Sequence, residues 1–179
     1  FGTIPFSILA RHGFIARTIL LSLKHRGIFT NDEINQIQAS VKTVASDLVD
    51  DIHSLKLESL SNSDFMERYG HLRPGTYDIA SPRYDQMKNL SNGLISPHQG
   101  QSINLFKLSK KQEKQINQLL EEDGFEEFDA SDLFNYINEA IVGREYGKFV
   151  FTRSVSNILE LIANFAEQHG LSRDEVSHV

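Results

Sequence analysis

Apolar residues recur at helical spacing through most of the chain, and the first such series lies near the N-terminus. It predicts a helix over residues 5–26, because the apolar positions follow each other at intervals of three, four or seven. Pro5 suits the first turn, where its missing N–H costs nothing, and Gly27 is a natural stop. The predicted core stripe of this helix consists of Ile8, Ile15, Ile19 and Leu23.

A second helix is predicted to begin at a T-x-x-E capping box formed by Thr30 and Glu33. Apolar residues then recur at near-heptad spacing, which predicts one helix of roughly 25 residues over 30–55. The three-residue connection between the two helices favours an antiparallel hairpin. The recurring positions are Ile34, Ile37, Val41, Val44, Leu48, Ile52 and Leu55.

After a short predicted helix over 63–69, led by Asn62 or Ser63, the periodicity disappears until about residue 104. An irregular insert over about 70–104 is uncommon inside a compact domain and is usually functional or mobile. Within it, only Thr76 to Ile79 resembles an extended segment. Three of the four prolines fall in this insert: Pro74, Pro82 and Pro97.

Helical patterns resume after a capping box at Ser109 and Gln112 and stop at Gly124. A long last helix is then predicted from a cap at Asp129 or Ser131 to His169, followed by Gly170. Gly143 and Gly147 weaken its middle, so we expect a kink or break there. The fold class is therefore all-α: a multi-helix bundle that begins with a long hairpin and carries one irregular insert, in a single helical domain over residues 1–179.

Composition narrows the class of protein. The chain has 179 residues, 40% hydrophobic and 23% charged, with no cysteine, which excludes disorder, a disulfide scaffold and thiolate metal sites. The net charge is −6, and residues 108–142 carry three basic and nine acidic side chains, which argues against a nucleic-acid partner. We interpret the acidic cluster at 121–132 as a solvated helix boundary. No apolar run approaches the roughly 20 residues that span a bilayer, so we expect no membrane contact and a cytoplasmic protein.

Polar residues interrupt the apolar stripe of the long last helix. Continuing the stripe through its middle leads to Arg144 or Glu145 and then to Lys148. Charged side chains at inward positions are costly unless they are paired or hydrated. Either Glu145 pairs with Lys148 while the charged groups reach water, or the three form a polar belt that faces a ligand or another domain.

The segment over 69–85, YGHLRPGTYDIASPRYD, is dense in functional groups. Its prolines and glycines restrict the backbone, so these side chains are presented with little freedom. Arginines beside carboxylates either pair with them or clamp anions such as phosphate. Two interpretations stay open: Asp78 and Asp85 hold the two arginines and the loop braces helices, or the loop contacts a ligand. With the polar belt, the candidate substrate-binding residues are His71, Arg73, Tyr77, Asp78, Arg83, Arg144, Glu145 and Lys148.

This segment resembles the Y-G-H-R-x-x-x-E-x-D-x-x-x-P-R-W/Y-x-E pattern of the phosphoenolpyruvate-utilising dikinase group, which includes phosphoenolpyruvate synthases and rifampicin phosphotransferases. Arg73 stands one position beyond the arginine of the pattern, where this chain has Leu72, and Thr76 or Tyr77 stands near its glutamate. The stretch over 143–179 resembles the R-E-x-x-K helix of the same group. The matching residues of the first segment are Tyr69, Gly70, His71, Asp78, Pro82, Arg83 and Tyr84.

The resemblance implies a multidomain enzyme that splits ATP and passes a phosphoryl group through a histidine to a small-molecule acceptor. It implies an ATP-grasp domain before Phe1 and a phosphohistidine domain after Val179, with ATP and Mg²⁺ bound outside this piece and no cofactor within it. Another S-x-x-E box at Ser172 opens a helix just before the sequence ends, so we expect a piece of a longer protein. This piece would be a non-catalytic connector or acceptor-substrate domain, because His71 is not in a phosphohistidine-type motif.

Two rival functions remain open from the sequence. The first is a stand-alone helical interaction module whose irregular loop is an epitope. The second is a metal-dependent hydrolase built from His12, His53 and His71 with Asp50 or Asp51.

Overall fold

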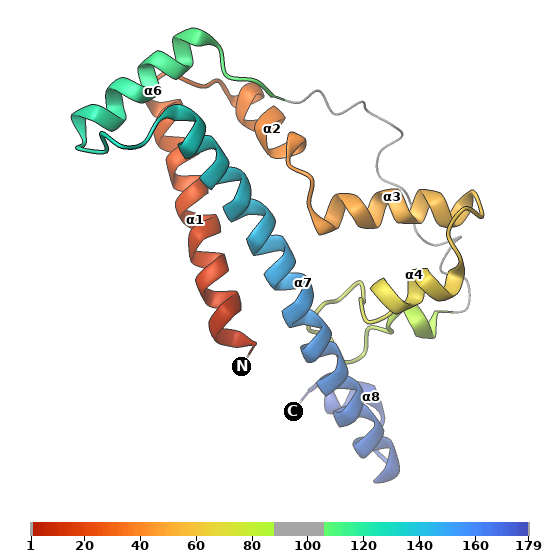
Figure 1. Ribbon diagram of the computed structural model, residues 1–179. Coiled ribbons are helices and arrows are strands. Elements are labelled where there is room, and N and C mark those ends of the chain that lie inside the picture. Colours follow the sequence, from red (N-terminus) through yellow and green to blue (C-terminus); the bar gives the residue numbers. More distant parts are fainter. Residues whose placement is uncertain (1, 88–105, 179) are drawn as a thin grey trace. The chain divides into compact units, whose positions relative to one another are not determined.

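A computed structural model describes residues 2–87 and 106–178, and these residues are helical and irregular, without strands (Figure 1). The all-α prediction is confirmed. The described residues form two compact units: unit 1 contains residues 3–44 and 106–147, and unit 2 contains residues 45–87 and 148–178. The single-domain interpretation stays a prediction. The helices are α1 (Thr3–His25), α2 (Asn31–Ser40), α3 (Val44–Lys56), α4 (Asn62–Tyr69), η1 (Tyr84–Gln86, a 3-10 turn), α6 (Lys110–Glu122), α7 (Ala130–Gln168) and α8 (Arg173–Val176).

Unit 1 is built on α1 and the first part of α7, which lie side by side, with α2 and α6 packed against them (Figure 1). The sequence placed the start of α2 and α6 correctly, because both capping boxes form as predicted, at Thr30 with Glu33 and at Ser109 with Gln112. Gln112 also ties α6 to the chain before α2, donating to the Ile28 carbonyl over 3.1 Å. The core of the unit includes Ala16, Leu20, Leu23, Ile28, Phe29, Ile34, Ile37, Ile116, Ile137 and Ala140.

The predicted core stripe of α1 is only partly correct. Leu23 is buried, but Ile8 and Ile15 are 52% and 41% exposed. The buried face instead carries the small residues Gly13 and Ala16. Small residues allow two helix backbones to approach closely, so the contact with α7 forms at these positions. The larger apolar side chains Ile8 and Ile15 lie outside this contact.

The predicted helix over 30–55 is two helices. The chain leaves the helical conformation after Ser40, and Val41 has extended backbone angles (φ −79°, ψ 115°). The Ser40 hydroxyl donates to the Ile37 carbonyl over 2.8 Å and so occupies an acceptor at the end of α2. The near-heptad pattern runs across this break and so did not reveal it. Helix α2 buries its apolar residues in unit 1, whereas α3 buries Ile52 in unit 2.

The expected break in the long last helix does not occur, because α7 is continuous over its 39 residues. Gly143 and Gly147 have a packing role instead. A Cβ added at Gly147 would lie 2.8 Å from Cδ1 of Leu9, and one at Gly143 would lie 3.2 Å from Cδ2 of the same side chain. The two glycines therefore make room for Leu9 of α1.

Unit 2 contains α3, α4, the irregular segment 70–87, the second part of α7 and α8. Ser61, one residue before the predicted leader, caps α4. The expected extended piece from Thr76 to Ile79 is wrong: turns form there, with the Asp78 N–H donating to the Gly75 carbonyl over 3.0 Å. The remainder of the predicted insert, including Pro97, lies outside the described residues. Buried apolar residues of the unit are Ile52, Phe65, Tyr69, Ile79, Ala163 and Ala166.

Helix α1 is long and apolar enough, by length and composition alone, to cross a membrane. The helix is interrupted by Arg11, Arg17 and Lys24, and the expectation of no membrane contact stays a prediction. One such helix near the N-terminus is weak evidence of a membrane segment, since core helices of soluble proteins and signal sequences share these properties.

Replacing Gly147 by Val is expected to lower the free energy of unfolding by about 1–3 kcal/mol, because the added carbons collide with Leu9. Urea unfolding followed by circular dichroism measures the change. Ser154→Val, at an exposed position of the same helix, is the matched control for helix propensity. Equal effects of the two substitutions would contradict the close-packing role of Gly147.

Candidate functional site

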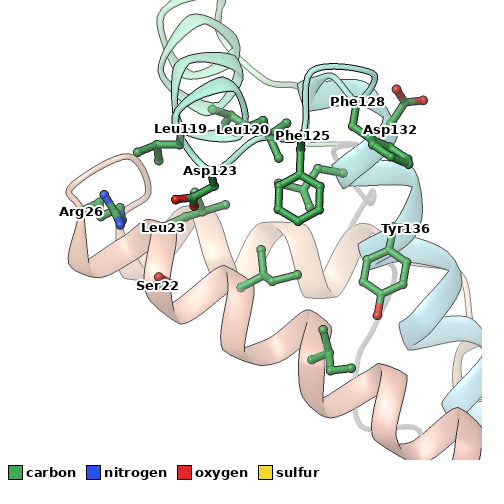
Figure 2. A pocket seen from close by; sticks show the side chains of 14 residues that line it. Ser22, Leu23, Arg26, Leu119, Leu120, Asp123, Phe125, Phe128, Asp132 and Tyr136 are labelled. Carbon is green, nitrogen blue, oxygen red and sulfur yellow. The ribbon is translucent and has the colours of Figure 1, made fainter.

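Unit 1 contains an apolar pocket of about 510 Å³ between α1, the end of α6 and the start of α7 (Figure 2). Apolar side chains from all three helices form most of its wall, and the connection between α6 and α7 contributes two phenylalanine rings. The lining residues are Ile15, Ile19, Ser22, Leu23, Arg26, Ile116, Leu119, Leu120, Asp123, Phe125, Phe128, Asp132, Leu133 and Tyr136.

The turn after α6 places the two phenylalanines. Gly124 adopts a positive φ of 82°, which ends α6 and lets the Phe125 N–H donate back to the Leu120 carbonyl over 2.8 Å. The rings of Phe125 and Phe128 meet edge to face with their centroids 6.4 Å apart, although both residues are more than half exposed. Figure 2 shows the Phe125 ring pointing toward α1.

Hydrogen bonds fix the wall that α7 provides. Asp129 caps this helix, because its Oδ1 accepts the N–H groups of Ser131 (2.8 Å) and Asp132 (3.0 Å). Asn117 of α6 accepts the Ala130 N–H over 2.7 Å and so ties the start of α7 to α6. Hydrogen bonds therefore fix the start of α7 and its position on α6, and with it this wall of the pocket.

The sequence analysis missed this pocket. It assigned the stripe of α1 to the core, whereas Ile15 and Ile19 line the pocket. It interpreted residues 121–132 only as a solvated boundary. The available signal was the pair Phe125 and Phe128, two large apolar residues in an otherwise acidic connection.

The loop over 69–87 in unit 2 is held on α7 by Arg73, whose side chain is 1% exposed. Its Nη1 donates to the carbonyls of Asp78 and Ser81, each over 3.1 Å. Its Nε and Nη2 donate to Ser156, and Nη2 also donates to Glu160 over 2.8 Å. Arg73 thus closes the loop on itself and attaches it to the helix.

Glu160 is the carboxylate that the sequence analysis did not identify as a partner. Arg173 of α8 donates to both of its oxygens (3.0 and 2.7 Å), and Gln86 donates to Oε2 over 2.7 Å. The hydrogen bonds from Arg173, and then those from Gln86 and Arg73, lower the pKa of Glu160 to about 2. A single carboxylate therefore joins the loop, α7 and α8.

The bracing interpretation of the loop is correct in part. Arg83 forms a two-pronged pair with Asp85 (3.1 and 2.7 Å), as expected, and also donates to Asn157 over 3.0 Å. Arg73, however, contacts the backbone carbonyl of Asp78 and not its carboxylate, which accepts the Ala80 N–H over 2.9 Å. Tyr77 is 61% exposed. Ligand contact by these residues stays a prediction.

His71 is the unusual residue of this loop. It is 4% exposed, its ring packs edge to face on Phe149 at 4.8 Å, and neither ring nitrogen has a hydrogen-bond partner. Burial, followed by the positive charges of Arg153 and Arg83, lowers the pKa of His71 to about 4. The imidazole is therefore neutral and unsatisfied, which costs folding free energy.

The three residues of the expected polar belt lie within about one turn of the continuous helix α7. A role for them in facing a ligand or another domain stays a prediction. Arg144 and Glu145 belong to unit 1 and Lys148 to unit 2. Arg144 and Lys148 are exposed and Glu145 is half-buried, and the observed ion pair joins Arg144 to Glu145 at 3.8 Å. The guanidinium of Arg144 also lies 5.6 Å from the centre of the Phe14 ring. The solvated interpretation fits these exposures.

Two residues of the metal-hydrolase rival, His12 and Asp51, have other partners. His12 Nδ1 lies 3.0 Å from the Tyr136 hydroxyl, and Asp51 accepts from Arg68 (3.1 Å) and Tyr69 (2.9 Å). Over residues 2–87 and 106–178, no group of three or more histidines and carboxylates is arranged to hold a metal.

The difference in stability between the wild type and Glu160→Gln is expected to depend on pH. Because the folded pKa of about 2 lies below the ordinary 4.5, the stabilisation is complete above pH 4.5 and is lost as the pH falls toward 2. Urea unfolding across this range should show the difference shrinking. Glu167→Gln, which removes a more exposed partner of the same Arg173, is the control. A difference that is constant with pH would exclude the proposed charge network.

His71→Leu is expected to keep or raise stability and to flatten its pH dependence. The unfolded histidine takes up a proton below pH 6.5 and the folded one only near 4, so the wild type alone loses stability over this range, by up to about 3 kcal/mol. Thermal melting at several pH values measures this, with the exposed His53→Leu as control. A parallel loss of stability in wild type and His71→Leu would show that His71 is not buried as a neutral group.

No protein family, no curated protein and no solved structure matches the chain. The resemblance of residues 69–85 and 143–179 to the patterns of the dikinase group therefore stays a prediction from the sequence.

Proposed function

We propose that this chain is a non-catalytic helical domain that binds a largely apolar small molecule in the pocket of unit 1. We further propose that it serves as the acceptor-substrate and connecting domain of an ATP-dependent phosphotransferase of the phosphoenolpyruvate synthase type. The pocket is the observation that carries the proposal.

The dimensions and chemistry of the pocket suit a small ligand. Binding sites for small molecules are typically cavities of about 300–1,000 Å³ with mainly apolar walls and a few polar groups. This pocket has about 510 Å³, with branched aliphatic and aromatic walls and polar groups at Ser22, Arg26, Asp123, Asp132 and Tyr136. Its walls come from helices that hydrogen bonds and a packed core hold in place.

A structural role for the loop over 69–87 supports the non-catalytic part of the proposal. All three nitrogens of the buried Arg73 guanidinium donate to protein acceptors. Arg83 is held by Asp85 and Asn157. Guanidinium groups whose donors are already bound by protein acceptors suit a structural role better than contact with a substrate.

The phosphotransferase context is supported by the way in which the two resembling segments meet. Residues 69–85 contact the stretch over 143–179 through Arg73 with Ser156 and Glu160, and through Arg83 with Asn157. The first segment therefore contacts the part of the second stretch that follows the R-E-x-x-K residues. In this proposal the flanking ATP-grasp and phosphohistidine domains supply ATP, Mg²⁺ and the phosphoryl group.

The second candidate is a helical interaction module without a role in phosphoryl transfer. It is favoured by the exposed apolar side chains of α1, Ile4 and Ile8, which are 71% and 52% exposed. A protein partner could cover such a row, because large exposed apolar patches mark interaction sites.

Ser22→Trp is expected to abolish binding of N-phenyl-1-naphthylamine, a neutral apolar reporter whose fluorescence rises in apolar sites. Ser22 is exposed and lines the pocket, so an indole at this position occupies part of the cavity and excludes the reporter. Ser7→Trp, at an exposed position of the same helix outside the lining, should bind the reporter as the wild type does. Fluorescence titration gives the affinities.

Equal reporter binding by both tryptophan variants would refute the pocket as a binding site.

The phosphotransferase context has its own test, in which the polypeptide as encoded is incubated with ATP, Mg²⁺ and apolar hydroxyl compounds. Phosphorus NMR should detect a phosphorylated acceptor that is missing with Ser22→Trp. Retained transfer with Ser22→Trp would place the acceptor elsewhere.

A further inference from the structure

The end of α7 in unit 2 buries small side chains on one side and exposes large apolar ones on the other. The buried side carries Ser156, Ala163 and Ala166. The opposite side, which we call the outer face of α7, leaves four large side chains between 44% and 68% exposed. Contiguous apolar surface of this kind marks an interaction site. The outer face consists of Ile158, Leu161, Ile162 and Phe165.

The outer face carries no charge. Residues 154–166 contain one charged side chain, Glu160, and it is held on the other side of the helix by Arg73 and Arg173. A basic or acidic partner would find no group on this face with which to pair. A second copy of the chain, with the same net charge of −6, approaches at least electrostatic cost through an uncharged surface.

The spacing on the outer face is that of a helix pair. The four residues follow each other at intervals of three, one and three, which places them in one row along the helix. The row is also self-complementary when read in the opposite direction. A two-fold axis just before Leu161 sets Ile162 opposite Ile158 of the second copy. The same axis sets Phe165 opposite the half-exposed Val155 and the two copies of Leu161 beside each other.

The size of the outer face suits a second copy as well. At these exposed fractions the four side chains offer roughly 400 Å² of apolar surface per copy, or about 800 Å² for a pair. Apolar atoms form about 65% of a homodimer interface, so the whole contact would bury about 1,200 Å². This is the lower limit for specific interfaces, and it predicts a dimer that forms at roughly micromolar concentrations.

We propose that two copies of this chain pair through the outer face of α7, with the two helices antiparallel about a two-fold axis beside Leu161. Every large apolar side chain of the face then meets an apolar side chain of the second copy. Because the same surface is used on both copies, the assembly closes as a dimer. This inference does not depend on the pocket of unit 1 or on phosphoryl transfer.

Sedimentation equilibrium of the polypeptide as encoded tests the pairing. The wild-type mass should rise from 20.3 kDa toward twice that value over roughly micromolar concentrations. Leu161→Glu should raise the dissociation constant at least about ten-fold, because it sets two carboxylates side by side in an apolar contact. Leu57→Glu is the matched control, since Leu57 is 65% exposed in unit 2 and lies outside α7. It should dimerise as the wild type does.

Cysteine cross-linking tests the antiparallel arrangement, because the chain has no cysteine of its own. Disulfides form only between residues whose Cα atoms come within about 7 Å. After mild oxidation, a mixture of Ile158→Cys and Ile162→Cys should therefore give more linked dimer than either variant alone. A parallel pair would link each variant to itself, and this result would overturn the proposed arrangement.

Two results of the sedimentation experiment would overturn the proposal. A wild-type chain that stays monomeric up to about 200 µM, well above the expected range, would assign the outer face to a different protein partner. A dimer that persists in Leu161→Glu would place the contact between copies elsewhere. Circular dichroism of both glutamate variants checks that the helices remain, as the exposure of both leucines leads us to expect.

Discussion

Helix α7 takes part in both units, and the contacts on each of its two parts organise the unit to which that part belongs. A single helix of 39 residues cannot bury its own apolar side, since helices gain most of their stability from packing against neighbours. Its first part packs on α1 and α6 in unit 1. Its second part is covered in unit 2 by the loop over 69–87 and by α8, which are attached at Ser156 and Glu160.

The two parts of α7 are covered by different chemistry. In unit 1 the contact with α1 is close where Gly143 and Gly147 face Leu9, and it also includes the pair of His12 with Tyr136. In unit 2 the helix buries Thr152 and Ser156, and a guanidinium with its acceptors replaces part of the apolar contact. Buried polar groups are tolerated only when their hydrogen bonds are made, which gives the loop one defined position. His71 departs from this rule, since its two ring nitrogens are unpaired.

Close packing also explains why unit 1 has a pocket. Small residues of α1 face α7, and larger ones, Ile15 and Ile19, are left on the flank. The turn at Gly124 brings Phe125 over this flank without filling it. The pocket therefore forms beside the α1–α7 contact, where the larger side chains Ile15 and Ile19 of α1 lie outside that contact. The acidic connection between α6 and α7 forms the outer wall of the pocket.

Local signals in the sequence were enough for the starts of several helices. The capping boxes at Thr30, Ser109 and Ser172 formed as predicted, because each depends on side chains three residues apart. Periodicity was less informative, since it could not detect the break after Ser40 or tell the buried stripe of α1 from an exposed one. Both depend on which neighbour packs where. The pairing of Arg83 with Asp85, two residues apart, was expected, whereas that of Arg73 with Glu160 was not.

The sequence by itself therefore determined the all-α fold class, the starts of α2, α6 and α8 and the loss of helical pattern after Tyr69, because these follow from interactions within a few residues. Only the tertiary structure decided that α2 and α3 separate, that Glu160 joins the loop to α7 and α8, and that Ile15 and Phe125 line one pocket. These features join residues up to 110 positions apart. Their contacts depend on side-chain size and hydrogen-bond geometry between packed elements, which no short-range pattern records.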